Sequence, residues 1–224
     1  MRPVLLAACV LLAVGCTAAV TGSNSMTAQQ KLFVEAKRAA ELKAKVLRDT
    51  PQTVKALNVT QFLGRWFEVY QDLVTAATFQ QNSFCATADY GIDTANPAHV
   101  TVSNREHYGA IDGPQKNVSG YAYQPNPTAE PGQLVVYLHG QNASPFPAPY
   151  WILRLGPVFG DHYEYAIVSD ELRLTLFVLA RNPGRFYSAF EGEVLAWLAA
   201  NGFGEWWNTP IKLQQDNCTY FPAN

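Results

Sequence analysis

The stretch Gly64-Arg65-Trp66-Phe67-Glu68-Val69-Tyr70 opens a run in which apolar and polar side chains alternate. Alternation with a period of two is typical of a half-buried β-strand. Asp161-His162-Tyr163-Glu164-Tyr165 opens a second such run, and Leu179-Ala180-Arg181-Asn182-Pro183 closes a third. We interpret these three segments, with the strand-like segments between them, as parts of one antiparallel barrel with an apolar interior.

Eight segments with this strand pattern follow one another between residues 65 and 181. Turn sequences such as Asp112-Gly113-Pro114 and Pro125-Asn126-Pro127 separate most of them. Eight short strands at regular spacing are typical of an up-and-down barrel or of a sandwich, and the hairpin-sized connections favour the barrel. The expected strands are Arg65–Asp72, Ser83–Gly91, His99–His107, Lys116–Tyr123, Gln133–His139, Tyr150–Leu155, Tyr163–Ser169 and Thr175–Arg181.

The pattern becomes helical after Pro183-Gly184 and ends at Asn201-Gly202, a typical helix terminus. One broad apolar stripe consists of Phe186, Phe190, Val194, Trp197 and Leu198. A stripe of this width must be covered, so a single amphipathic helix is expected on the outer face of the strands that hold Phe67, Val69, Leu176 and Val178. The expected fold class is therefore all-β, an eight-stranded antiparallel up-and-down β-barrel with a C-terminal α-helix outside and an N-terminal helical extension.

The composition supports a large core and no broad electrostatic role. Apolar residues make up 48% of the 224 residues and aromatic residues 12%, which excludes wholesale disorder. The net charge of −2 gives no general attraction to nucleic acid, and no basic stripe is present. Residues 23–50 carry six Lys or Arg and three acids, whereas residues 51–224 carry nine and fifteen, so a basic leader precedes a mildly acidic domain.

Residues 1–22 have the pattern of a signal peptide. Arg2 supplies the positive start, Val4 to Val14 form a short apolar core, and cleavage is expected between Ala18 and Gly22. This pattern predicts a secreted, extracellular protein. Alternatively, the segment is a bacterial lipoprotein box in which Cys16 is acylated and anchors the chain to a membrane.

Residues 23–55 form a basic leader or linker ahead of the barrel domain, which is expected to span residues 56–224. Apolar residues between positions 27 and 49 recur near helical spacing, and Thr50-Pro51 ends the pattern. The expected helix is either a solvated or partly disordered leader, or a segment that makes weak contact with a membrane surface or a partner.

Cleavage of the signal peptide leaves two cysteines, Cys85 and Cys218. Two cysteines in an exported chain predict one disulfide, which here would join an early strand to the C-terminal tail. Two free buried thiols are the alternative. Export through a eukaryotic secretory route is also favoured by four glycosylation sequons, which begin at Asn58, Asn117, Asn142 and Asn217.

Six segments, in this order, resemble the lipocalin family, and within it the branch of apolipoprotein D and the bacterial lipocalins. The resemblance extends over residues 56–220 and departs from the family pattern at Phe177, where Trp is common, and at His162. The leader at 23–50 lies outside it. The matching segments are Asn58 to Tyr70, Cys85 with Ala88-Asp89-Tyr90, Ala148-Pro149-Tyr150-Trp151-Ile152-Leu153, Asp161 with Tyr165-Ala166-Ile167-Val168, Leu179-Ala180-Arg181-Asn182-Pro183, and Asp216-Asn217-Cys218.

The resemblance implies structural roles for Gly64, Trp66, Asp161 and Arg181. A barrel that holds an apolar molecule needs one sealed end, and a guanidinium can stack on an indole ring while it donates to carbonyl groups. Gly64 would let the chain approach closely as it enters the barrel.

Ligand contacts are expected from side chains that point into the barrel. Side chains alternate between the two faces of a strand. Counted from Trp66, Glu68 and Tyr70 are expected inside, and counted from Arg181, Phe177 and Leu179 are expected inside. Tyr165 and Ile167 are the expected inward residues of the seventh strand. On the sixth strand either Tyr150 and Ile152 or Trp151 and Leu153 face inward. Glu68 would hold a polar ligand head or bond to Arg or Tyr at the base, because an inward carboxylate needs a partner. The candidate ligand-binding residues are Glu68, Tyr70, Tyr150, Trp151, Ile152, Tyr165, Ile167, Phe177 and Leu179.

No catalytic residue, metal site or cofactor is predicted. The four histidines (His99, His107, His139 and His162) are far apart and lack metal-ligand spacing. Phosphate loops and nucleophile elbows are also missing. The expected function is extracellular binding and transport of a small hydrophobic ligand by a monomer or weak dimer: a fatty acid, lysophospholipid, sterol, retinoid or tetrapyrrole. The alternatives are a lipocalin-fold enzyme acting on a lipid or isoprenoid, or a membrane-tethered lipoprotein in lipid handling or stress response.

Overall fold

The computed structural model describes residues 50–139 and 146–223, which belong to the second of two compact units of the chain, Arg48–Asn224. The predicted signal peptide, the helix expected over residues 27–49, Cys16 and Asn142 lie outside the described residues.

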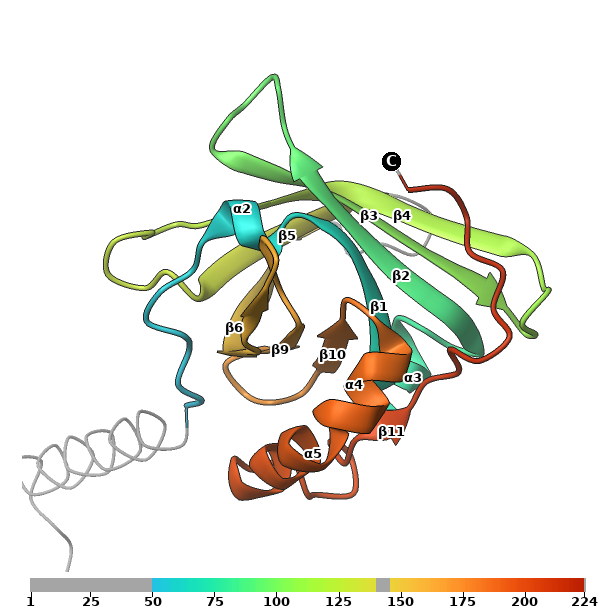
Figure 1. The fold of residues 1–224 in the computed structure, drawn as a ribbon. Helices are drawn as coiled ribbons and strands as arrows, with labels where there is room; N and C mark the ends of the chain where they lie inside the picture. Colours follow the sequence, from blue (N-terminus) through green and yellow to red (C-terminus); the bar gives the residue numbers. More distant parts are fainter. Residues whose placement is uncertain (1–49, 140–145, 224) are drawn as a thin grey trace, which may run out of the picture. The chain divides into compact units, whose positions relative to one another are not determined.

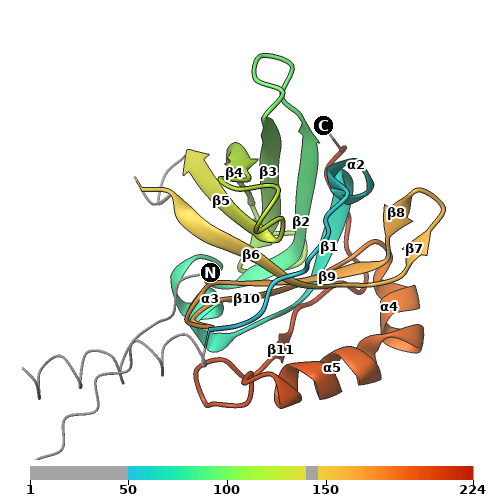
Figure 2. The ribbon, with the colours of Figure 1, turned by 90° about the vertical axis from the view of Figure 1, so that its left-hand side faces the viewer.

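Eight antiparallel strands close into a barrel, which confirms the predicted fold class (Figures 1 and 2). Each strand pairs with the next along the chain, and the first pairs with the last, Phe67 lying opposite Ala180. The barrel strands are β1 (Gly64–Gln71), β2 (Ser83–Ile92), β3 (His99–Tyr108), β4 (Gln115–Tyr123), β5 (Gln133–His139), β6 (Ala148–Leu155), β9 (Tyr165–Ser169) and β10 (Leu176–Ala180).

Shorter elements decorate the two ends and one side of the barrel. The helix α2 (Val59–Phe62) lies at the end where β1 begins, and α3 (Leu73–Thr78) follows β1 at the opposite end (Figure 1). The remaining elements are the hairpin β7 (Val158–Phe159) and β8 (His162–Tyr163), the helices α4 (Pro183–Ala189) and α5 (Glu191–Ala200), and β11 (Ile211–Lys212), which pairs with the end of β1.

The C-terminal helix is interrupted, so the prediction of a single helix is wrong. At Phe190 the backbone leaves the helical region, with φ −125° and ψ −20°, and α5 begins at the next residue. This break lets the Phe190 ring lie 5.5 Å from the ring of Tyr165 on β9. The stripe still covers the barrel: Phe186, Val194 and Leu198 are buried against it.

The expected seat of these helices is largely confirmed. Val69, Leu176 and Val178 belong to the buried cluster under α4 and α5. Phe67 does not, because its ring packs on Tyr220 of the C-terminal tail at 4.8 Å. A second cluster fills the inside of the barrel around Trp66. The strands therefore bury apolar side chains on both faces.

Trp66 and Arg181 seal the end of the barrel next to α2, as predicted. The indole is fully buried and donates to Phe62 O at 2.8 Å, and the Arg181 guanidinium lies 3.8 Å above the ring. The same guanidinium donates to five backbone carbonyls, those of Gln61, Phe62, Leu63, Arg65 and Tyr163, at 2.7 to 3.3 Å. This burial lowers the pKa of Arg181 to about 10, so the group remains a cation at neutral pH.

Gly64 is required where the chain turns from α2 into β1. Its φ of +93° is in the region that side chains disfavour, and a Cβ there would lie 3.3 Å from Arg181 Nη1. The predicted structural roles of Gly64, Trp66 and Arg181 thus share one cause, the close packing of α2 against the barrel.

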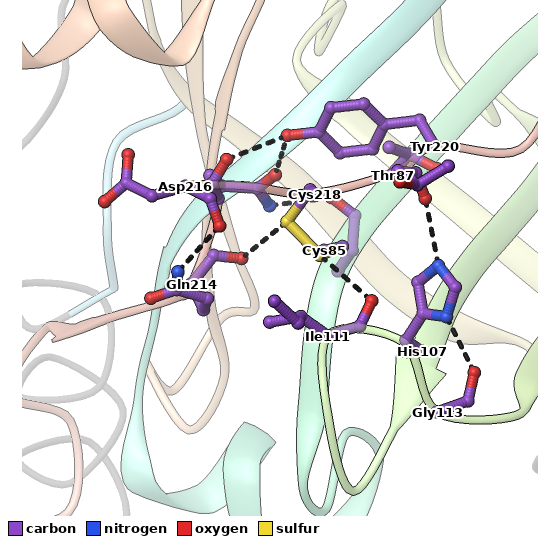
Figure 3. Close-up of a disulfide and its surroundings, with 12 residues drawn as sticks. Cys85, Thr87, His107, Ile111, Gly113, Gln214, Asp216, Cys218 and Tyr220 are labelled. Atoms are coloured by element: carbon purple, nitrogen blue, oxygen red, sulfur yellow. Dashed lines mark hydrogen bonds between the residues drawn. A yellow bond between two sulfur atoms is a disulfide. The ribbon is translucent and has the colours of Figure 1, made fainter.

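The predicted disulfide between Cys85 and Cys218 is present, with Cα atoms 5.6 Å apart (Figure 3). It fastens a tail that also bonds along the strands. Gln215 Nε2 donates to Glu68 O and Ala86 O, and the Cys85 amide donates to Gln214 O. His107 contacts the carbonyl of Gly113 (Figure 3) and, with its other ring nitrogen, that of Thr219.

We expect Arg181→Lys to lower the free energy of unfolding by about 2–4 kcal/mol, because lysine can neither stack on Trp66 nor reach five carbonyls. Urea unfolding followed by tryptophan fluorescence measures the change. Arg154→Lys is the matched control on the outer surface, where about 0.5–1 kcal/mol is expected. Equal midpoints for both variants would show that the closed end does not depend on the guanidinium.

We expect the Cys85→Ser/Cys218→Ser variant to lose up to about 5 kcal/mol of stability, because the bond closes a loop of 133 residues. Thermal unfolding with and without reductant measures this loss. Reductant should lower the unfolding temperature of the wild-type protein and should leave that of the variant unchanged. A variant as stable as the oxidised wild type would mean that the tail contacts suffice without the bond.

Candidate ligand-binding cavity

The interior of the barrel is lined by apolar side chains that come from nearly every strand. Inward positions include Val102 on β3, Ala122 on β4, Leu134 on β5 and Val168 on β9, all buried. Other inward residues keep part of their surface accessible, among them Val136 and Leu138 on β5 and Phe177 on β10. Side chains that face inward yet stay accessible border space inside the barrel.

A small pocket of about 10 Å³, room for about one water molecule, lies where α2 meets the strands. Two tyrosine hydroxyls, Tyr90 Oη and Tyr150 Oη, bond to each other within this lining at 2.7 Å. Burial raises the pKa of both hydroxyls, so they remain neutral. The lining residues are Leu57, Val59, Phe62, Tyr90, Val100, Ala122, Leu134 and Tyr150.

Four apolar candidates from the sequence lie in the interior cluster: Tyr150, Ile152, Phe177 and Leu179. On β6 the alternative with Tyr150 and Ile152 inward is the one that the structure adopts. Leu153 faces the opposite way and packs under the helices. Whether these residues touch a ligand stays a prediction.

Four other candidates face outward. The predicted inward position is wrong for three of them, and Trp151 belongs to the alternative for the sixth strand that the structure does not adopt. Tyr70, Trp151, Tyr165 and Ile167 all pack in or against the cluster under α4 and α5. The Tyr70 hydroxyl donates to Glu191 on α5 at 2.7 Å, and the Tyr165 hydroxyl donates to Glu193 at 2.6 Å.

Two physical reasons explain these errors. A bulge in β1 between Glu68 and Tyr70 inserts an extra residue, which turns Tyr70 to the outer face. On β9 the cross-strand partners of inward Phe177 and Leu179 are Val168 and Ala166. Tyr165 and Ile167 therefore point outward, since side chains alternate along a strand.

Glu68 lies inside the barrel, as predicted, and its carboxyl is buried. Its Oε2 accepts from Gln80 Nε2 at 2.7 Å, and its Oε1 has no hydrogen-bond partner. Burial raises the pKa of Glu68 to about 8. The Gln80 hydrogen bond opposes this effect, and the charges of Glu106 and Asp72 add to it. The carboxyl thus titrates near neutral pH.

Sequence reasoning missed Tyr90, Gln80 and Asn104. Strand parity could have found Tyr90, because it follows inward Ala88 by two positions. Asn104 lies directly opposite Ala88 on β3, so the register of that hairpin would have found it too. Gln80 follows α3 in an irregular connection, and no periodic signal places it next to Glu68.

Asp161 does not take part in the closed end. It is exposed in the turn between β7 and β8. The acid that organises a turn is Asp170, whose carboxylate accepts from the backbone amides of Leu172, Leu174 and Thr175 at 2.8 to 3.1 Å. This side chain holds the connection from β9 to β10.

The sequon asparagines Asn58, Asn117 and Asn217 are exposed, so a glycan could be attached without loss of packing. Their use stays a prediction. Within residues 50–139 and 146–223, no group of three His, Cys, Asp or Glu side chains could hold a metal ion. In the same ranges, none of the helices has the length and hydropathy needed to cross a membrane.

Comparisons with known proteins agree with this architecture. The lipocalin-like domain family matches residues 57–201. Temperature-induced lipocalin-1 of Arabidopsis thaliana is 27% identical over 137 residues, which are 58% of this chain and 66% of that protein, slightly under two thirds of its length.

Two solved structures are also similar. Japanin from Rhipicephalus appendiculatus, bound to cholesterol, is 15% identical with a TM-score of 0.47, over 74% of this chain and 99% of japanin. Lobster apocrustacyanin A1 is 19% identical with a TM-score of 0.49, over 75% of this chain and 91% of its own. Because the family match covers more than half of the sequence and the strands close as described, the chain belongs to the lipocalin-like family.

Proposed function

We propose that this protein binds and carries a small hydrophobic molecule outside the cell, with the ligand held inside the barrel. The observation that carries this proposal is the partly accessible apolar lining, which includes Val136, Leu138 and Phe177. A fatty acid, lysophospholipid, sterol, retinoid or tetrapyrrole has the apolar body that such a lining accommodates.

The energetics are adequate for reversible carriage. Burial of about 250–300 Å² of apolar ligand surface at ~25 cal/mol/Å² contributes about 6–7 kcal/mol before ordering costs. This free energy corresponds to a dissociation constant of about 10–40 μM. A carrier needs this range, because it must both hold and release its ligand.

The sealed end supports one-sided access. Trp66 and Arg181 close the end next to α2, so a ligand would enter through the opposite end, which we call the mouth. The connections at the mouth carry exposed apolar side chains, namely Leu73, Phe79, Ile111, Phe146, Leu172 and Leu174. We propose that this rim makes weak contact with lipid surfaces during ligand exchange.

A binding role is favoured over the enzymatic alternative. Family members that are enzymes use a cavity thiol in some cases, and Cys85 is bonded to Cys218 here. The buried Glu68 lies beside Gln80 and not beside a nucleophile. These features support binding without catalysis.

We expect Val136→Phe to weaken retinol binding about tenfold or more, because the added ring occupies the space that the ligand needs, and tenfold corresponds to about 1.4 kcal/mol. Quenching of tryptophan fluorescence measures the affinity. Val135→Phe is the matched control, since Val135 is the neighbouring outward position on β5. Equal losses in both variants would contradict an interior site. No binding by the wild type to retinol, cholesterol or oleic acid would defeat the carrier proposal.

We further propose secretion, supported by the signal pattern, the disulfide and the exposed sequons. Protein recovered from the medium of eukaryotic cells should begin between residues 19 and 22 and should lose mass on treatment with an N-glycosidase. N-terminal sequencing and intact mass measure both properties. Retention in membranes with an acylated Cys16 would instead establish the tethered alternative.

A further inference from the structure

We propose that the interior contains a head-group subsite, built on Glu68 and Gln80, that takes the protonated primary amine of an otherwise apolar ligand. The subsite rests on the proposed carrier function and specifies the ligand class. It is a cluster of acceptor oxygens inside an apolar barrel.

Glu68 supplies the first acceptor. It is 5% exposed and faces into the barrel two positions after Trp66. Its Oε2 accepts from Gln80, and its Oε1 is buried without a hydrogen-bond donor. A buried carboxyl oxygen without a donor is unfavourable, so a ligand that supplies one is stabilised relative to the empty site.

Gln80 supplies a second acceptor, and a further buried oxygen without a donor, Asn104 Oδ1, lies elsewhere on the inner face, on β3. Because the Gln80 amide nitrogen donates to Glu68, its carbonyl Oε1 is the free end of that side chain, and this atom is buried without a donor. A primary ammonium group has three N–H donors and no acceptor, which complements acceptor oxygens.

The charges around Glu68 are mainly negative. The charges of Glu106 on β3 and Asp72 at the start of α3 both raise the pKa of its carboxyl, and the Glu68 charge in turn raises the pKa of Tyr90 and Tyr150. Nearby cations have other partners: Lys116 lies 4.0 Å from Glu106, and the Arg181 guanidinium donates to backbone carbonyls. A carboxylate ligand would meet repulsion here, and a hydroxyl offers a single donor.

Binding of an ammonium group is linked to ionisation of Glu68. In the empty protein the raised pKa, about 8, keeps much of the Glu68 carboxyl protonated at pH 6 to 7. A bound cation lowers this pKa, so binding releases a proton, and affinity rises with pH until the carboxyl is ionised in the empty protein. Above that pH the affinity levels off, until the ligand loses its own proton.

Calorimetric titration of the full-length oxidised protein with decylamine, 1-decanol and decanoate, from pH 6 to pH 9, tests the subsite. We expect decylamine to bind at least about tenfold more tightly than 1-decanol at pH 8, because charge-assisted hydrogen bonds are the stronger ones. Its affinity should rise by up to about tenfold per pH unit between pH 6 and pH 8. The affinity for decanoate should fall over the same pH range.

Glu68→Gln should bring the affinity for decylamine down to that for 1-decanol and abolish its pH dependence. The affinity for 1-decanol should stay unchanged. Glu205→Gln is the control, because Glu205 is exposed on the C-terminal segment far along the chain from the barrel strands. The wild-type pH profile alone tests the subsite if Glu68→Gln does not fold.

The outcomes separate the two proposals. Binding of retinol and 1-decanol with no preference for decylamine, or with no pH dependence, overturns the subsite and leaves the carrier function in place. A pH-dependent preference that survives Glu68→Gln also overturns it. If the protein binds neither retinol nor any of the three decyl compounds, both proposals are overturned.

Discussion

The contact between Arg181 and Trp66 joins parts of the chain that are far apart in sequence. The guanidinium lies 3.8 Å above the indole and bonds to carbonyls of the segment that leads into β1. The cation satisfies these carbonyls, which lie in the segment that covers this end of the barrel, where burial limits their access to water. The same cation sits at the end of β10, the strand that pairs with β1 and closes the barrel. The side chain that closes the end of the barrel therefore lies next to the strand pair that closes the sheet.

The sequence predicts those features that local patterns and single partners determine. The alternation of apolar and polar side chains predicted both ends of every barrel strand to within two residues. The segment expected at Tyr163–Ser169 is, however, divided between β8 and β9. Two cysteines left one pairing, and that pairing is present. The roles of Trp66 and Arg181 were implied by the resemblance to the lipocalin motifs and are consistent with the affinity of a cation for an aromatic ring.

Features that depend on bulges and irregular segments were not predictable in the same way. The bulge after Glu68 sends Tyr70 outward, and nothing in the sequence Glu68-Val69-Tyr70 marks an extra residue. On β9 the error has another origin: both faces of that strand are apolar and buried, so its composition cannot distinguish inside from outside. Gln80 reaches Glu68 only because the chain after α3 folds back toward the barrel. Site residues of this kind require the tertiary structure.

The division of the barrel strands between two cores explains how a rigid fold can retain an accessible interior. Under α4 and α5 the packing is dense, and residues such as Val69, Leu176 and Val178 have no exposed surface. Inside the barrel, several members of the cluster remain partly accessible. Apolar burial supplies most of the stability of a domain, so the outer core, the tail and the disulfide can maintain the fold while some inward side chains stay partly accessible. The same argument applies to Glu68, since a buried oxygen without a donor is tolerated when stability comes from elsewhere.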